Sequence, residues 1–204
     1  WHLCGYGTCG VGYAVFGEKA GGAMSKISQN QLTITTPTLA HKTAILNFRQ
    51  EFNAKFDEMH GSNELNAFTD GGFVGWLNYI NTPKGTEWFE YSKVSDGTYI
   101  ALLEDKVVGI MHLRFELNEI LLERGGHLGY STHPDFWGRG IASCMVNFSR
   151  TLFKEKGLNK ILITCYDDNL ASKTVILNNG GVLENAIQAN DKTICRYWIT
   201  LADE

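Results

Sequence analysis

Apolar residues recur along the chain with two different periods, and these periods predict which segments form helices. Apolar side chains lie three and four positions apart in residues 39–59, 71–80 and 138–156, a spacing typical of amphipathic helices. Residues 169–179 follow Asp167 and Asp168, which are suited to capping a helix, and precede Gly180-Gly181. We therefore expect four helices, with Gly157 closing the third.

Short apolar or β-branched runs between turn residues predict the strands. These runs are residues 32–35, 97–105, 106–115, 126–132, 160–165, 182–188 and 193–201. The run 160–165 (KILITC) is apolar almost throughout, as expected for a strand buried on both faces. The order β-α-α-β-β-β-α-β-α-β-β predicts a single α/β domain. Its central sheet should be mixed, mostly antiparallel and flanked by helices.

The first 23 residues differ in composition from the rest, with seven glycines and two cysteines. We interpret residues 1–23 as a non-native or poorly packed extension and residues 24–204 as the domain, with Met24 as its natural start. Gly5, Gly7 and Gly10 match the pattern G-x-G-x-x-G. No strand is expected before these glycines and no helix after them, so the match does not indicate dinucleotide binding.

Composition narrows the function classes. The 204 residues carry 22 acidic and 18 basic side chains, a net charge of −4, which argues against a general nucleic-acid-binding protein. No run of about 18 apolar residues predicts a membrane span. The cysteine count is odd, and Cys144, Cys165 and Cys195 lie in apolar segments, which favours a reducing cytoplasm. No His/Cys spacing predicts a metal site. The oligomeric state, monomer or homodimer, stays open.

The clearest chemical signal lies in residues 126–148, where Pro134 ends a strand and Gly138-Arg139-Gly140 precedes a long helix. Glycines leave backbone N–H groups open to a ligand, and the helix dipole favours negative charge at that end. This is also the most basic region of the chain, with Arg139, Arg150, Lys154, Lys156 and Lys160. The pattern predicts a site for a ligand with several phosphates, although such glycines also occur as simple turn residues.

In order and spacing, this half of the chain resembles the acetyl-coenzyme A binding half of the GCN5-related N-acetyltransferase (GNAT) superfamily. The resemblance rests on Pro134-x-x-W-G-R-G-I-A, the strand KILITC, Asn169-x-x-Ser172 and Gly180-Gly181, and it runs from about Thr98 to the end. The stretches FRQEF (48–52), MHGS (59–62), ELN (116–118), GGHLGYS (125–131) and RYWI (196–199) resemble a subgroup usually labelled only as predicted acetyltransferases. The resemblance therefore implies a single-domain GNAT fold but no particular substrate.

The resemblance also implies where acetyl-CoA would bind. The family's pyrophosphate loop falls on Trp137, Gly138, Arg139, Gly140, Ile141 and Ala142, with Trp137 in place of the usual Arg or Gln. The strand edge beside the pantetheine arm falls on Tyr130, Ser131 and Thr132, and the helix positions beside that arm fall on Asn169 and Ser172. The helical tyrosine that protonates the leaving thiolate in many relatives falls at Ile176, so that acid is absent.

The implied activity is that of an acyltransferase moving the acetyl group of acetyl-CoA to a primary amine of a small molecule or peptide, by direct attack in a ternary complex. The amine needs a base, for which His127 and Glu116 are candidates, and the thiolate needs an acid, for which Tyr130 and Tyr166 are candidates. Each also has a structural interpretation as a bonded strand histidine, a solvated carboxylate or a packed tyrosine. Ile176 keeps a non-catalytic acyl-CoA-binding or regulatory domain as the alternative.

Overall fold

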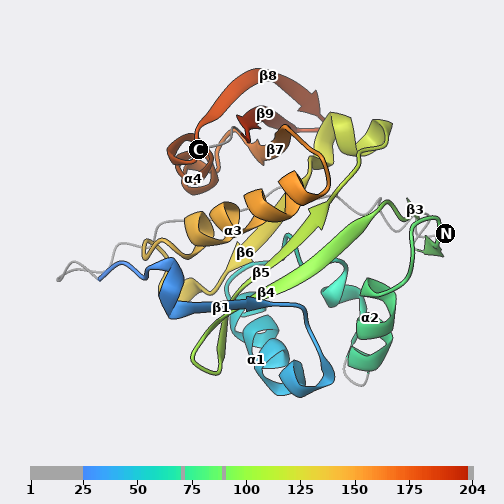
Figure 1. The fold of residues 1–204 in the computed structure, drawn as a ribbon, viewed down its shortest axis with the longest axis vertical. Coiled ribbons are helices and arrows are strands. Elements are labelled where there is room, and N and C mark those ends of the chain that lie inside the picture. Colours follow the sequence, from blue (N-terminus) through green and yellow to red (C-terminus); the bar gives the residue numbers. More distant parts are fainter. Residues whose placement is uncertain (1–24, 70–71, 89–90, 202–204) are drawn as a thin grey trace.

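The computed structural model describes residues 25–69, 72–88 and 91–201. The interpretation of residues 1–23 as an extension falls outside the described residues. Figure 1 shows helices α1 and α2 on one side of a twisted sheet and α3 on the other, with α4 and the last three strands beyond α3. The predicted fold class, an α/β fold with a mostly antiparallel sheet flanked by helices, is confirmed, although the described strands form separate sheets in which every pair is antiparallel.

The elements of the described chain follow the predicted order. The helices are α1 (Lys42–Asn53), α2 (Phe73–Ile80), α3 (Ile141–Glu155) and α4 (Leu170–Asn178). The strands are β1 (Leu32–Thr35), β2 (Glu87–Trp88), β3 (Tyr91–Ser92), β4 (Asp96–Leu103), β5 (Lys106–Arg114), β6 (Leu128–Thr132), β7 (Lys160–Tyr166), β8 (Gly181–Ala189) and β9 (Lys192–Thr200). Short helical turns occur at Gln29–Gln31, Leu39–His41, Leu65–Ala67, Leu121–Gly125 and Pro134–Phe136.

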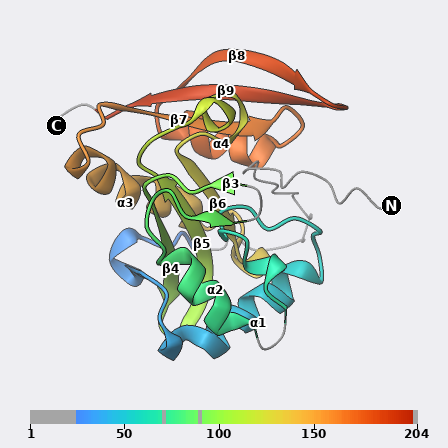
Figure 2. The ribbon, with the colours of Figure 1, turned by 90° about the vertical axis from the view of Figure 1, so that its right-hand side faces the viewer.

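The strands form two main sheets instead of one continuous ladder. One sheet has the order β1-β4-β5-β6 and the other β7-β9-β8, with β2 and β3 forming a separate hairpin. Neighbours pair antiparallel throughout these ladders. Figure 2 shows the β7-β9-β8 sheet crossing the end of the molecule above the first sheet. The boundary between the two sheets falls between β6 and β7.

The first helix is shorter than its apolar pattern predicts. It ends at Asn53, whereas the apolar spacing continues to Phe56 and Met59. These two side chains pack against the same cluster as the buried face of α1, although the chain there is no longer helical. Tertiary packing thus extends a helical pattern beyond the helix. The hairpin β2–β3 escapes prediction because two-residue strands are too short to show alternation.

Two hydrophobic clusters cover the two faces of the first sheet. Ile110 of β5 belongs to the cluster formed with α1 and α2, and the next residue, Met111, belongs to the cluster formed with α3. Burial on both faces explains why residues 106–115 are apolar almost without interruption. Among the described residues, the structure holds no helix with the length and apolar character needed to cross a membrane.

Candidate functional site

The strands β6 and β7 leave an open gap between the two sheets. Just before β6, the His127 carbonyl accepts the Arg114 N–H of β5 at 2.7 Å. Just after β6, the His133 N–H donates to the Val108 carbonyl of β5 at 2.8 Å. Bonding in an antiparallel ladder alternates, so the peptide groups of Tyr130 and Thr132 face the opposite edge, toward β7. Two of the predicted edge residues therefore present their backbone to the gap.

In the described chain, hydrogen bonds join these two edges at His127, just before β6 begins. The His127 N–H donates to the Leu162 carbonyl at 2.7 Å, and the Leu162 N–H donates to His127 Nδ1 at 2.8 Å. Beyond this point β6 pairs with β5 and β7 with β9 in the described ladders. By the same alternation, the peptide groups of Thr164 and Tyr166 face the gap from the β7 side.

His127 therefore closes the narrow end of the gap. Its ring is 7% exposed and meets Phe153 edge-on, with Trp198 nearby. Burial lowers the pKa of His127 to about 4, and its Nδ1 is already engaged as an acceptor. Because the Leu162 N–H occupies this nitrogen, the bond favours the structural interpretation of the candidate base.

Tyr130 lies on the α3 and α4 side of β6. Its hydroxyl is 3.3 Å from Ser172 Oγ, and burial raises its pKa well above the ordinary value. The Ser172 N–H donates to Asn169 Oδ1 at 3.0 Å, so Asn169 is the cap of α4. Tyr130, Asn169 and Ser172 are thus brought together, as the resemblance implies. Ile176, one turn further along α4, is fully buried.

The prediction that Asp167 and Asp168 cap α4 is wrong. Asn169 takes that position because its side chain reaches the Ser172 N–H. The Asp167 carboxylate instead pairs with Lys173 and accepts the Cys195 thiol. This lowers the pKa of Asp167, mainly through the bond from Lys173. Cys165, a buried residue of the neighbouring strand, has a pKa raised to about 12 by burial, which fits a core role.

The glycines before α3 have the backbone that their sequence predicts. Gly138 has φ 73° and Gly140 φ 88°, in the left-handed region that favours glycine. Gly140 occupies the N-cap position and offers no side chain as a cap, and the Cys144 N–H bonds back to its carbonyl at 3.0 Å. The N–H groups of Ile141, Ala142 and Ser143 come before that bond and lie at the positive end of the helix dipole. This end of α3 can hold an anion.

Trp137 joins this loop to the open strand edge. Its indole N–H donates to the Thr132 carbonyl at 3.0 Å, and its ring lies 4.8 Å from that of Phe56. The departure from the family's usual Arg or Gln therefore places a structural side chain at this position. The indole thereby connects the loop before α3 to the strand edge at the gap.

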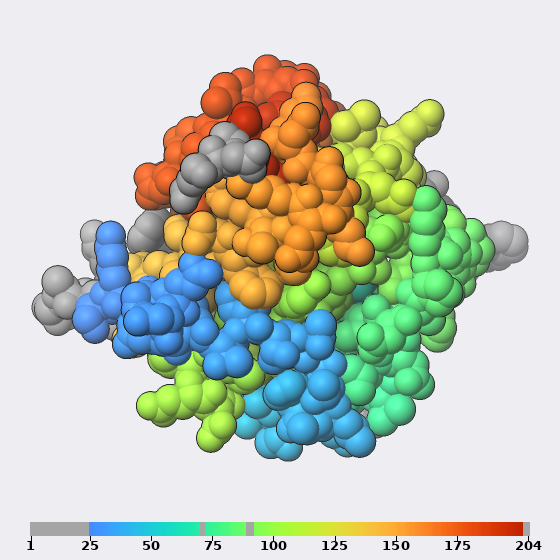
Figure 3. Space-filling model, in the orientation of Figure 1, coloured from blue at the N-terminus to red at the C-terminus, as the bar shows by residue number. Residues whose placement is uncertain are grey.

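The chain that begins at Ser25 runs beside this loop. The Ile27 N–H donates to the Arg139 carbonyl at 2.8 Å, and Arg139 Nε donates to the Ser25 carbonyl at 3.2 Å. Figure 3 shows this segment, in blue, against the start of α3. The other basic side chains are spread out, with Lys156 over the Phe115 ring and Lys160 over the Trp198 ring. The anion site therefore consists mainly of backbone N–H groups, since these basic side chains do not form a cluster.

Residues 58–64 form a loop, here called the 58–64 loop, on the opposite face of β6 from Tyr130. Ser131 Oγ donates to the His60 carbonyl at 2.8 Å. Ser131 pairs with Ile110, which faces α1 and α2, whereas Tyr130 pairs with Met111, which faces α3. Ser131 therefore fixes this loop at the gap instead of binding from the pantetheine side.

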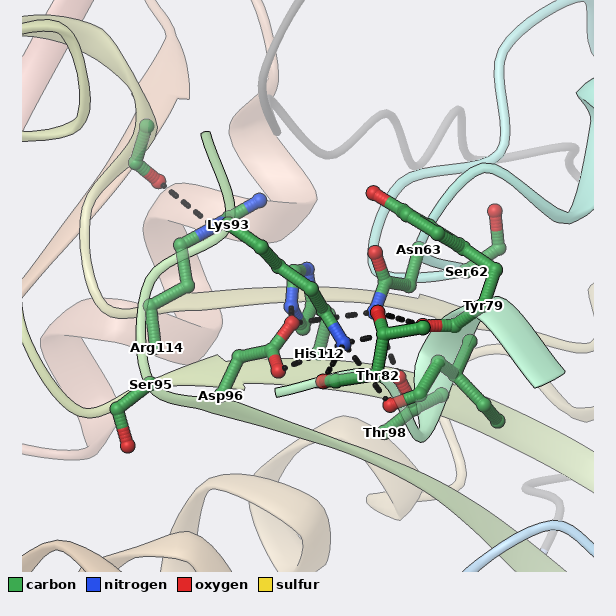
Figure 4. A network of polar contacts seen from close by, with 12 residues as sticks. Ser62, Asn63, Tyr79, Thr82, Lys93, Ser95, Asp96, Thr98, His112 and Arg114 are labelled. Atoms are coloured by element: carbon green, nitrogen blue, oxygen red, sulfur yellow. Dashed lines mark hydrogen bonds and ion pairs between the residues drawn. The ribbon is translucent and has the colours of Figure 1, made fainter. Parts of the chain in front are cut away.

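Buried polar groups behind the loop form the network in Figure 4. Lys93 Nζ donates to the carbonyls of Tyr79, Ile80 and Thr82 at 3.0–3.1 Å and lies 3.2 Å from Asp96 Oδ1. His112 Nε2 lies 2.8 Å from Asp96 Oδ2, and burial lowers its pKa to about 4. Asn63 Nδ2 donates to Asp96 and to Thr98 Oγ1. The network ties the end of α2 and the 58–64 loop to the sheet.

Comparison with known proteins identifies the family. The model of the acetyltransferase (GNAT) domain matches residues 31–182, about three quarters of the chain. The chain belongs to the GNAT acetyltransferase family. Among proteins of curated function, the comparison found no match.

Solved structures share the GNAT fold at low sequence identity. A ribosomal-protein-S5-alanine acetyltransferase from Vibrio fischeri has 16% identity and a TM-score of 0.62, covering 85% of this chain and 94% of that one. A GNAT acetyltransferase from Streptococcus pneumoniae has 15% identity and a TM-score of 0.58, covering 84% and 99%. The microcin C7 self-immunity acetyltransferase, solved with acetyl-CoA and AMP, has 17% identity and a TM-score of 0.62, covering 87% and 97%.

Glu116 lies away from the gap of this GNAT domain, just after β5. Its carboxylate accepts Lys84 Nζ at 2.7 Å and the Ser95 N–H at 2.9 Å, and these bonds lower its pKa. A carboxylate stabilised in this way is a weaker base. The second candidate base therefore also has a structural contact.

One group of described residues in the GNAT domain has the spacing of metal ligands, namely Glu51, His133 and Asp135. Lys106 donates to Glu51 at 3.1 Å, and Lys55 donates to Asp135 at 2.9 Å. Both carboxylates are thus already neutralised by ammonium groups. The group carries no metal proposal, and the expectation that the protein needs no metal stays a prediction.

Proposed function

We propose that the protein is an acetyl-CoA-dependent N-acetyltransferase acting on a primary amine of a small molecule or peptide. The observation that carries the proposal is the gap between β6 and β7, whose backbone edges are open and which leads to the uncapped start of α3. A strand edge suits the amides of a pantetheine arm, and a helix start suits a pyrophosphate.

The residues at the gap fit acetyl-CoA in two places. The N–H groups of Gly138 and of residues 140–142 would hold the pyrophosphate, since the approach at Gly138 is open and no side chain caps the helix. The Arg139 N–H already donates to the Phe136 carbonyl. The peptide groups of Tyr130 would pair with the pantetheine arm, as would the N–H of Thr132, whose carbonyl already accepts the Trp137 indole N–H. Asn169 and Ser172 would lie beside the arm on the Tyr130 side. Bound there, acetyl-CoA would supply the acetyl thioester.

Tyr130 would donate the proton to the leaving thiolate, in place of the tyrosine that is absent at position 176. Its hydroxyl meets the first turn of α4 at Ser172, four residues before Ile176. The phenol therefore approaches from β6 the region that the family's usual tyrosine would reach from α4. The phenol carries its proton at neutral pH, as tyrosines ordinarily do, and this is the proton that a leaving thiolate would take.

The acceptor is proposed as a class of amine and not as a single compound. The Vibrio fischeri relative is named for a ribosomal protein and the microcin relative for self-immunity, which supports both peptide and small-molecule amines. Identities of 16–17% do not choose between them. A cytoplasmic location and a monomeric or homodimeric state also stay predictions.

Thiol release from acetyl-CoA tests the function. The protein is mixed with acetyl-CoA and, separately, spermidine, tyramine or a short peptide with a free amino terminus, and free coenzyme A thiol is measured. We expect amine-dependent release with at least one class. Coenzyme A binding without release for any amine would support the non-catalytic alternative instead.

A further inference from the structure

A buried histidine of the 58–64 loop lies next to the open edge of β6. His60 is 4% exposed, and its carbonyl accepts the Ser131 hydroxyl. The loop touches the strand so closely that a Cβ on Gly61 would lie 2.3 Å from the Gly129 carbonyl oxygen and 2.5 Å from Tyr130 Cα. Gly61 thus lies against the peptide between Gly129 and Tyr130, and its neighbour His60 is held at β6 through the bond to Ser131.

The loop is held from behind as firmly as it is held on the strand. The Trp76 indole N–H donates to the carbonyls of Ser62 and Asn63, both at 3.0 Å. The Asn63 side chain is bound in turn to Asp96 and Thr98, within the network of Figure 4. A side chain held in this way can keep one geometry through a reaction.

His60 and Tyr130 lie on opposite faces of the same strand. The Tyr130 hydroxyl points to α4, while His60 lies on the α1 and α2 side with Ser131. Direct acetyl transfer has the same two-sided requirement, because the amine must lose a proton where it attacks and the thiolate must gain one where it leaves. Tyr130, the acid of the proposed function, lies on the α4 side of β6. A base is therefore needed on the α1 and α2 side.

One carboxylate and two cations lie around the His60 ring. Its Nε2 lies 3.5 Å from Glu58 Oε2, a carboxylate that can stabilise a protonated imidazole. Burial, with the positive charges of Lys192 from β9 and Arg114 from β5, lowers the pKa of His60 to about 4. The ring is therefore neutral at neutral pH, the form that accepts a proton.

We propose that His60, supported by Glu58, is the base that deprotonates the acceptor amine. This inference rests on the proposed function and deepens it. One proton passes from the ammonium to the imidazole, and the amine nitrogen then forms its bond to the acetyl carbon while the carbon–sulfur bond breaks. The thiolate takes a proton from Tyr130, the second proton of the nitrogen passes to the resulting Tyr130 phenolate, and His60 releases its proton to solvent.

The pH dependence of His60→Gln tests the assignment. At pH 7 an alkylamine is protonated, so losing the base should lower kcat/KM by about 10²-fold. As the pH rises toward the pKa of the amine, free amine becomes available from solution, and the deficit should shrink steadily. The substrate is whichever of spermidine, tyramine and the peptide reacts fastest in the thiol-release screen.

His133→Gln is the matched control, because it replaces another buried histidine whose ring pairs with Glu51 outside the gap. Its rate, relative to the unchanged protein, should not vary with pH in this way. Glu58→Gln supplies a second variant, with a smaller deficit of the same pH dependence. Coenzyme A should raise the melting temperature of all these proteins equally.

A readout without turnover uses the ring nitrogen signals of histidine in NMR. Adding the alkylamine to the protein with bound coenzyme A should shift the His60 signals, assigned by their loss in His60→Gln, and leave those of His133 in place. An unshifted His60, or a His60→Gln variant as active as the unchanged protein at every pH, overturns the assignment while the proposed function stands. An unchanged protein that releases no thiol with any amine overturns both.

Discussion

At the scale of single residues, the site depends on which groups already have partners. His127 and Glu116 both carry bonds that explain their positions, the first to Leu162 and the second to Lys84 and Ser95. In the described structure, the Tyr130 hydroxyl lies 3.3 Å from the Ser172 hydroxyl. This contact is weak enough to be replaced by a ligand. Of these three candidates, Tyr130 is therefore the one whose side chain can take part in the reaction.

Replacing Tyr130 by Phe should lower kcat by about 10²-fold, because the ring stays in place and the proton donor is lost. Coenzyme A should still stabilise the variant against heat as it does the unchanged protein. Tyr99→Phe is the control, since Tyr99 is a partly buried tyrosine of β4 that packs on Phe148. A Tyr130→Phe variant that keeps its rate would show that the phenol only packs.

Part of the cofactor half could be predicted, because glycines before a helix leave a local signal and the family resemblance placed Asn169 and Ser172, whereas the cap of α4 was wrongly assigned to Asp167 and Asp168. Gly138 and Gly140 have the positive φ that their pattern predicts, and Asn169 and Ser172 lie beside Tyr130. His60 could not be found in the same way. Its place at β6 results from a contact between residues about 70 positions apart, and the stretch MHGS that contains it contributed to the family resemblance without giving His60 a role.

At the scale of elements, the 58–64 loop and β6 act as one unit. Gly61 has φ 71° and lies against the peptide between Gly129 and Tyr130. No apolar period predicts this contact, because it depends on the absence of a side chain. By contrast, α3, β5 and β7 were predicted to within three residues at either end, since each has a long apolar pattern.

Gly61→Ala should therefore destabilise the protein more than a matched change elsewhere. Gly85→Ala is the control, because Gly85 has φ 83° but nothing within 4 Å of an added Cβ. Both variants carry the cost of a positive φ, and only Gly61→Ala also overpacks the loop against the strand, for about 1–3 kcal/mol more. Urea unfolding measures the difference. Equal costs would mean that the loop is not tightly fixed on β6.

At the scale of the whole molecule, the division into two sheets creates the site. A single continuous sheet would have used the backbone edges of β6 and β7 in a ladder. The apolar pattern alone could not reveal the division, because both strands are apolar and β-branched whether or not they pair. The family resemblance predicts that the strands ending near Thr132 and Cys165 splay apart, and in the described chain they are joined at His127 and Leu162.

Buried histidines should make the stability of the whole protein fall in acid. His60, His112 and His127 each have a folded pKa of about 4, below the unfolded value near 6.5. The unfolded chain then binds more protons between these values, so each histidine contributes stability that is present above pH 6.5 and is lost as the pH falls toward 4. From pH 7 to pH 5 the loss is about 2 kcal/mol for each.

His127→Gln should reduce that loss by about 2 kcal/mol, the share of one histidine. The measurement is the free energy of unfolding in urea at pH 7 and pH 5 for both proteins, each compared with its own value at pH 7. The variant is expected to be less stable at pH 7 because the bond from Leu162 is disturbed. A fall as steep as that of the unchanged protein would mean that His127 is protonated in the folded state at pH 5.

The central claim is that acetyl-CoA binds along the gap with its pyrophosphate at the start of α3, and thermal unfolding with coenzyme A tests it most directly. At about 100 times its dissociation constant, coenzyme A should raise the melting temperature by roughly 5–10 °C. Gly140→Asp places a negative charge where the pyrophosphate would lie and should abolish most of this rise. Gly157→Asp adds the same charge at another positive-φ glycine, at the far end of the same helix, and should keep it in full. A Gly140→Asp variant that coenzyme A stabilises as well as Gly157→Asp would contradict the account.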